Sequence, residues 1–152
     1  MPNDGGFAIE ARGVARRFGD RQALAGVGFT VARGEVFGVL GPNGAGKTTT
    51  VRVLNGMIAA DAGYARVCGL DPRVEGDAVR ARTGVLTEQP AIYEPLTGRA
   101  NLAFFGRLRG LSGHDLDRAV VRALGAVGLL DRADSAASTY SKGMKQRLAI
   151  AR

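Results

Sequence analysis

The sequence predicts an α/β protein with a helical insertion, and three features support this prediction. The chain starts with short alternating apolar runs typical of strands, it passes from an apolar run through a glycine-rich loop into a helix, and its second half is mostly helical in pattern. Its 152 residues are 45% hydrophobic, which is enough to build a globular core. We therefore expect residues 1–152 to form one domain, in which about 84–141 make a helical insertion.

The N-terminal part is expected to be β. Phe7–Ala11 and Val14–Phe18 are short, partly alternating runs, Gly19-Asp20 supplies a turn, and Leu24–Val31 resumes the extended pattern. Glu35–Leu40 is a nearly continuous apolar run, which is typical of a strand buried on both faces.

The apolar run is followed by the glycine-rich loop and then by a helix. The expected helix covers Thr48–Leu54, and Val51, Leu54 and Ile58 keep helical spacing. After a turn, Tyr64–Val67 is expected to form another strand.

The second half begins with short elements and a loop. Glu75–Arg82 is expected to be a helix and Gly84–Leu86 a strand, and Pro90 and Pro95 place a loop after it. Thr97 can cap the next helix. That helix carries apolar residues on one face, namely Leu102, Phe105 and Leu108.

The helical pattern then continues to the last residues. Ser112, with Asp115 three residues later, is a capping-box pattern. The following helix has an apolar stripe made of Leu116, Val120, Leu124 and Val127. Asp131–Tyr140 is small and polar, so it is expected to be a loop, and Ser141 is expected to open a final helix over Lys142–Arg152.

Charge and composition exclude several classes of partner. A formal net charge of +7 would suit a nucleic acid, but the arginines are scattered and only 6% of residues are aromatic. We therefore expect a solvated, arginine-rich surface and no nucleic-acid partner. The sequence has no apolar run of bilayer length, no secretory signal and a single cysteine, Cys68, and these features predict a cytoplasmic protein.

The glycine-rich loop carries the clearest chemical signal, because Gly41, Gly46, Lys47 and Thr48 meet the pattern G-x-x-x-x-G-K-[ST]. Glycines let the backbone curl until successive N–H groups point inward, and the following helix adds unpaired N–H groups and the positive end of its dipole. Lys47 can reach the β- and γ-phosphates, Thr48 can bind Mg²⁺ and Thr49 suits the α-phosphate. The loop predicts binding of ATP with Mg²⁺. The expected contact residues are Gly41, Pro42, Asn43, Gly44, Ala45, Gly46, Lys47, Thr48 and Thr49.

Three ordered motifs resemble one family. Leu24–Glu35, Gly41–Thr49 and Tyr140–Leu148 together resemble the ATP-binding subunit of ABC transporters over nearly the whole chain. The resemblance implies the N-terminal portion of an ABC-type nucleotide-binding domain, with a P-loop NTPase core, an N-terminal antiparallel β subdomain and an α-helical signature subdomain. The variant signature and Val85–Gln89 resemble the exporter-like ABC-2 branch, which implies an ATPase subunit that powers export.

The resemblance also implies roles near the nucleotide. Phe18 lies where the family places an aromatic ring against adenine, although a core position in a β-hairpin is an alternative. Glu88, with Gln89 next to it, falls where the family has a glutamine that touches Mg²⁺. Lys47 and Glu88 are therefore the expected catalytic residues, and Thr48 and Glu88 are the expected metal ligands.

The signature implies protein partners. In the family, its residues contact the γ-phosphate bound by the opposite subunit, which assigns that contact to Ser141, Lys142 and Gly143 of a homodimer or heterodimer that encloses ATP. Lys142 and Lys145 are expected to reinforce the positive end of their helix. The other implied partner is a transmembrane permease, which would hold the protein at the cytoplasmic face of the cell membrane.

The family pattern extends beyond the signature, to a strand with the Walker B aspartate, a glutamate that polarises water and a switch histidine. None of these occurs in residues 1–152, so we expect a truncated piece that is an ATPase only in the complete protein and is inactive alone, with an open sheet edge beside Val36–Leu40. Two alternatives stay open: a soluble ABC-type ATPase that acts on the ribosome or DNA, and a nucleotide sensor that does not hydrolyse ATP.

Overall fold

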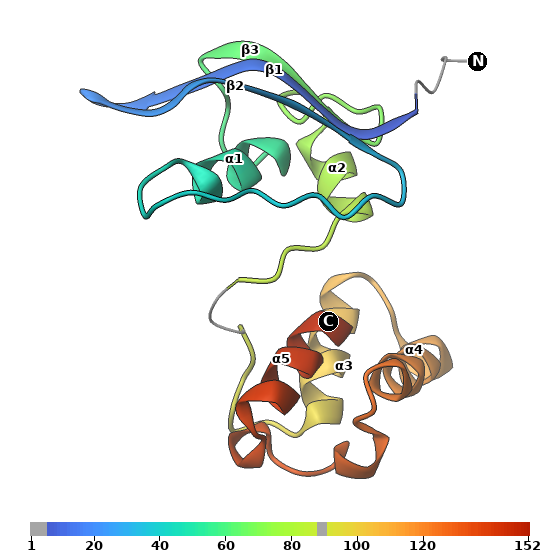
Figure 1. Ribbon diagram of the computed structural model, residues 1–152. Coiled ribbons are helices and arrows are strands. Elements are labelled where there is room, and N and C mark those ends of the chain that lie inside the picture. The colour runs from blue at the N-terminus through green and yellow to red at the C-terminus, as the bar shows by residue number, and fades with distance from the viewer. Residues whose placement is uncertain (1–5, 88–90) are drawn as a thin grey trace. The chain divides into compact units, whose positions relative to one another are not determined.

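The computed structural model describes residues 6–87 and 91–152. The chain divides into two compact units, Met1–Gly84 and Val85–Arg152, which we call the N-terminal and C-terminal units (Figure 1).

An antiparallel sheet forms one layer of the N-terminal unit, with strand order β2-β1-β3. Its strands are β1 (Phe7–Phe18), β2 (Arg21–Ala32) and β3 (Ala62–Val67). The extended segments expected from the alternating apolar residues are confirmed, but β1 is one long strand rather than two short ones. A register shift between Ala11 and Val14 explains the difference, since a bulge interrupts the alternation of the side chains without ending the strand.

Helices α1 (Lys47–Leu54) and α2 (Gly76–Arg82) lie on one face of this sheet (Figure 1). Thr50 and Val53 are buried on α1, whereas Val51, which keeps helical spacing with Leu54, is 44% exposed. The core between α1 and the sheet consists of small and branched apolar side chains, namely Ala11, Val14, Leu24, Val53 and Ala65.

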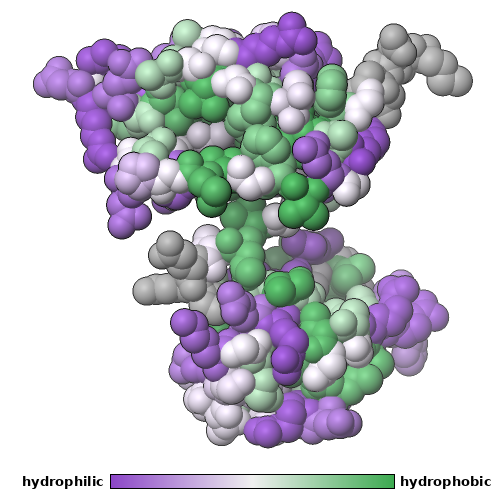
Figure 2. Space-filling view, in the orientation of Figure 1, coloured by the Kyte–Doolittle hydropathy of each residue, from purple (hydrophilic) through white to green (hydrophobic). Residues whose placement is uncertain are grey.

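The prediction of strands at Glu35–Leu40 and Gly84–Leu86 is wrong, because neither segment is in a strand. A strand buried on both faces also needs a paired neighbour, and none of the described strands pairs with Glu35–Leu40. Val36 is 100% and Leu40 94% exposed, while the ring of Phe37 stacks on Phe29 of β2 at 5.0 Å between centroids. Apolar side chains therefore reach the surface of this unit (Figure 2).

The C-terminal unit is helical, as expected. It contains α3 (Gly98–Leu108), α4 (Gly113–Ala126) and α5 (Lys142–Ala151), with the short 3₁₀ turns η1 (Leu130–Arg132) and η2 (Ala137–Thr139) between α4 and α5. Across residues 6–87 and 91–152, every helix falls short of the length and apolar character that crossing a bilayer requires.

The apolar stripes predict four residues of this core, namely Leu102, Leu116, Val120 and Leu124. It is built from one face of each helix and the chain between α4 and α5, and comprises Leu102, Leu116, Val120, Leu124, Leu129, Ala133, Ala137, Tyr140 and Leu148. Leu108 is an exception at 70% exposure, because it is the last residue of α3 and projects beyond the packed face.

Two local predictions in this unit are corrected. Ser112 is the N-cap of α4, but its side chain accepts no capping bond, and Asp115 instead pairs with Arg118 at 2.6 Å, so the capping box does not form. The expected loop Asp131–Tyr140 includes η2 and part of η1, and it packs into the core because its small residues allow a close approach.

Candidate functional site

The glycine-rich loop enters α1 through Gly46, which has φ +90°. A Cβ at this position would lie 2.5 Å from the Ala23 carbonyl oxygen and 2.7 Å from Leu24 Cδ2. Both the left-handed backbone and the close approach to β2 therefore require glycine at the helix entrance.

Lys47 is the first residue of α1, and its side chain folds back over the loop. Its Nζ donates to the carbonyl oxygens of Gly41 at 2.6 Å and Pro42 at 2.8 Å, and the Ala45 N–H donates to the Pro42 carbonyl at 3.2 Å. These bonds keep the loop curled beneath a positive charge, as a phosphate cradle requires.

The first turn of α1 provides the donors of this cradle. The helical hydrogen bonds begin with the Thr50 N–H, which donates to the Gly46 carbonyl at 2.8 Å, and the Thr50 hydroxyl donates to the same oxygen at 3.0 Å. The amides of Lys47, Thr48 and Thr49 precede this bond, so they lie where a helix leaves N–H groups without intrahelical partners.

The residues at this helix start also fit Mg²⁺. The Thr48 side chain is exposed and Thr49 is half-buried, so a hydroxyl is accessible beside the cradle. Mg²⁺ needs only one or two protein oxygens, because phosphate and water fill its other positions. Within residues 6–87 and 91–152, no group of three or more histidine, cysteine or acidic residues could hold a metal.

A hollow of about 390 Å³ lies between the loop and β2, lined by residues 22–27, Gly44 and Ala45. Arg21 directly precedes these lining residues in β2, and a Cβ on Gly44 would be 3.3 Å from Arg21 Nη2. Arg21 is paired with Phe18 across the hairpin turn, so it connects the expected adenine-stacking residue to the loop. Sequence reasoning missed Arg21, and its signal was its position directly opposite Phe18.

Phe18 ends β1 and is 47% exposed, so it is not a core residue of the hairpin. The guanidinium of Arg16 lies 4.9 Å from its ring centroid. Phe18 therefore presents a partly exposed aromatic ring at the end of the hairpin, opposite Arg21.

The proposed metal contact at Glu88, and the neighbouring Gln89, lie outside the described residues.

The C-terminal unit carries the signature at the start of α5. Ser141 is the N-cap, and its Oγ accepts from the Met144 N–H at 3.2 Å. Lys142 and Gly143 are exposed in the first turn. Tyr140 is buried just before them and donates to the Arg132 carbonyl oxygen at 2.5 Å, and burial raises the pKa of its phenol. A fixed turn therefore presents the exposed N-terminus of α5.

The two lysines of this helix differ in their surroundings. Lys145 Nζ lies 2.6 Å from Glu94 Oε1, so its charge is compensated within the unit. Lys142 is exposed at the helix start, where its charge adds to the positive end of the helix dipole.

An antiparallel sheet, a curled glycine-rich loop and a lysine at a helix start define a P-loop nucleotide-binding protein of α/β class. Comparison with known proteins identifies the family. A model of the ABC transporter family matches residues 24–152. The chain belongs to this ABC transporter family, as an ATP-binding domain.

Curated relatives agree in sequence. The chain is 48% identical over 147 residues to daunorubicin resistance ATP-binding protein DrrA3 of Streptomyces coeruleorubidus, which covers 95% of this chain and 46% of that protein. It is 43% identical over 145 residues to Nod factor export ATP-binding protein I of Paraburkholderia xenovorans, covering 95% of this chain and 48% of that protein. The chain thus spans about half the length of the curated relatives it matches.

Solved structures agree in fold. An ATP-binding subunit of an ABC transporter matches with a TM-score of 0.77 and 29% identity, covering 95% of this chain and 60% of the other. The structure of cbiO1 from Clostridium perfringens, part of the ABC transporter complex cbiONQ, matches with a TM-score of 0.86 and 24% identity over 96% of this chain and 60% of the other. The P-loop NTPase fold predicted from the sequence is confirmed.

Proposed function

We propose that the full-length protein containing these residues binds ATP with Mg²⁺ at Gly41–Thr49 and hydrolyses it to power an ABC exporter. The observation that supports this most directly is the ammonium of Lys47, held 2.6 Å from the Gly41 carbonyl at the start of α1, in a chain of the ABC transporter family. Relatives named for daunorubicin resistance and for Nod factor export support export as the direction of transport.

The roles around the nucleotide follow from this proposal. Lys47 binds the β- and γ-phosphates, Thr48 and Glu88 hold Mg²⁺, and Phe18 stacks on the base. Bound Mg²⁺ would neutralise the phosphate charge, and the backbone amides of the loop would orient the phosphates. With Glu88 as the second metal ligand, both expected catalytic residues act on the γ-phosphate side.

The partners are proposed on the same basis. Ser141, Lys142 and Gly143 contact the γ-phosphate held by a second copy or a related subunit, so that ATP is enclosed between two P-loop domains. A transmembrane permease subunit anchors the dimer at the cytoplasmic face of the membrane.

Titration of the full-length protein with a fluorescent ATP analogue and Mg²⁺ tests the cradle. Lys47→Ala removes charge-assisted hydrogen bonds and is expected to weaken binding about tenfold to a hundredfold. Arg52→Ala, which removes one positive charge from the exposed far end of α1, is the matched control and is expected to bind normally. Equal affinities of Lys47→Ala and the parent would reject the proposed site.

Phosphate release and sedimentation test the remaining parts. Hydrolysis that depends on the reconstituted permease is expected, whereas binding without phosphate release would favour a sensor and stimulation by ribosomes or DNA would favour the soluble alternative. Lys142→Glu is expected to weaken ATP-driven dimerisation because it reverses a charge at the start of α5. Unchanged dimerisation would remove Lys142 from the proposed contact.

A further inference from the structure

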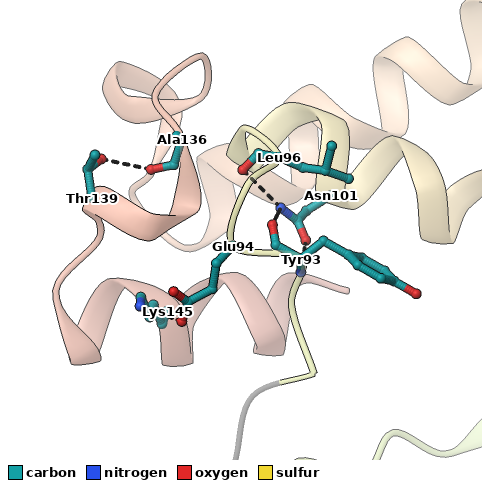
Figure 3. Close-up of polar contacts among 7 residues, drawn as sticks. All are labelled: Tyr93, Glu94, Leu96, Asn101, Ala136, Thr139 and Lys145. Atoms are coloured by element: carbon teal, nitrogen blue, oxygen red, sulfur yellow. Dashed lines mark hydrogen bonds and ion pairs between the residues drawn. The ribbon is translucent and has the colours of Figure 1, made fainter.

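The segment that leads into α3 is held by one buried side chain. Asn101 is 1% exposed, and its Nδ2 donates to the carbonyl oxygens of Tyr93 at 2.9 Å and Leu96 at 3.3 Å (Figure 3). It also donates to the Thr97 carbonyl oxygen at 3.0 Å. Its Oδ1 accepts from the Tyr93 N–H at 2.7 Å. The amide group is bonded on both sides, so the backbone of residues 93–97 is fixed in one conformation.

The same segment is bonded to the chain just before the signature. The Ala137 N–H donates to the Leu96 carbonyl and the Ser138 N–H donates to the Glu94 carbonyl, both at 2.8 Å. Ser138 lies three residues before Ser141, so the approach to the signature is attached to residues 93–97 through the backbone.

Glu94 makes a second connection, on the other side of the signature. Its Oε1 lies 2.6 Å from Lys145 Nζ, and these side chains are 54% and 23% exposed (Figure 3). The Lys145 N–H donates to the Ser141 carbonyl at 2.9 Å, so the charged pair is one helical turn from the N-cap. The far end of α5 is also held, because Arg152 Nη1 donates to the Ala91 carbonyl at 2.6 Å.

We propose that Glu94 is a positioning residue for the signature: with Lys145, it sets the orientation of the start of α5 and therefore of Ser141–Gly143. Asn101 supports this role, because it fixes the backbone that carries Glu94. A helix is rigid over one turn, so a change at Lys145 moves the amides of the first turn with it. The inference rests on the proposed contact of the signature with a phosphate held by a second subunit.

A charge swap in the full-length protein tests this role. Glu94→Lys and Lys145→Glu each place like charges at the contact, and each is expected to weaken ATP-driven self-association about fivefold to tenfold, as measured by analytical ultracentrifugation. The double variant restores opposite charges and is expected to recover to within about twofold of the parent protein. Asp115→Asn, which breaks the exposed pair with Arg118 on α4, is the control and is expected to change nothing.

Two further measurements distinguish failure of the positioning role from failure of the proposed trans contact. At protein concentrations where the parent stays monomeric, affinity for the fluorescent ATP analogue is expected to be the same in the parent and in all variants, because the substituted residues all lie in the C-terminal unit and the P-loop lies in the other. Amide hydrogen exchange over Ser141–Lys145 is expected to accelerate in the single variants and to recover in the double variant.

Each outcome has one meaning. A parent protein that binds ATP without self-association would overturn the proposed trans contact, and this inference with it. Single variants that associate like the parent, or a double variant that does not recover, would overturn the positioning role alone. Unchanged amide exchange in the single variants would do the same.

Discussion

The guanidinium of Arg16 lies 4.9 Å from the ring centroid of Phe18, and Asp61 holds it through an Nη1–Oδ1 contact of 2.7 Å. The other carboxylate oxygen of Asp61 accepts from the Arg17 N–H, also at 2.7 Å. One carboxylate next to β3 therefore orients the end of β1, where the proposed adenine-stacking ring is located.

Asp61→Asn is expected to lower the melting temperature at pH 7 by an amount that shrinks in acid. The Arg17 N–H and, after it, the charge of Arg16 hold the pKa of Asp61 below its ordinary value. A carboxyl with a lowered folded pKa stabilises the fold above its unfolded pKa, and this stabilisation is lost as the pH falls through the folded pKa, below about 4. Thermal melts at pH 7 and pH 3 measure the difference. Asp20→Asn in the adjacent turn is the control, and an equal effect of Asp61→Asn at both pH values would contradict the expectation.

Gly46→Ala is expected to destabilise the protein by about 2 kcal/mol or more, because it combines left-handed strain with a backbone clash. The added Cβ would meet the Ala23 carbonyl oxygen at 2.5 Å. Denaturant unfolding measures the loss, and nucleotide affinity should fall with it. Gly28→Ala on β2, the strand that Gly46 approaches, is the matched control, since its Cβ would come no closer than 3.7 Å to the Ala11 carbonyl oxygen. Equal stability of the two variants would argue against a constrained helix entrance.

Asn101→Ala is expected to cost about 1–3 kcal/mol, because it removes the side-chain partners of part-buried backbone groups of residues 93–97. Urea unfolding of the full-length protein measures the cost. Gln146→Ala on the exposed face of α5 is the control and should lie within about 0.5 kcal/mol of the parent protein. A loss no larger than the control's would show that water replaces the side chain of Asn101.

Leu124→Ala and Leu108→Ala form a matched pair with opposite expectations. Leu124 is completely buried on α4, so its truncation should cost about 2–5 kcal/mol, whereas Leu108 is 70% exposed and should cost about 0.5 kcal/mol or less. Chemical denaturation measures both. Similar losses would mean that Leu108 is covered in the full-length protein.

Local signals in the sequence predicted most of the fold. The spacing of Gly41, Gly46 and Lys47 locates the loop and the start of α1, because one short segment supplies all the groups involved. Periodicity likewise predicts the buried face of α4, where Leu116, Val120 and Leu124 are buried, since a helix forms its hydrogen bonds within itself.

The remaining features depend on residues far apart in the sequence. Glu35–Leu40 has the composition of a strand, but a strand forms only with a paired neighbour. The contact of Arg21 with the loop depends on the hairpin placing β2 against Gly44. The role of Asn101 depends on a loop conformation that no periodic pattern encodes.

Lys47 has a further consequence for selectivity. Its ammonium is already bonded to two carbonyl oxygens, at 2.6 and 2.8 Å, so an incoming anion must replace these partners rather than neutralise a free charge. Only the difference in strength between the bonds of Lys47 to these carbonyl oxygens and its bonds to the anion contributes to affinity. Chloride or a single carboxylate gains little from such an exchange, whereas a chain of phosphates brings several negative oxygens at once. We therefore expect the loop to bind a chain of phosphates in preference to small anions, because the Gly41 and Pro42 carbonyl oxygens compete with any anion for Lys47.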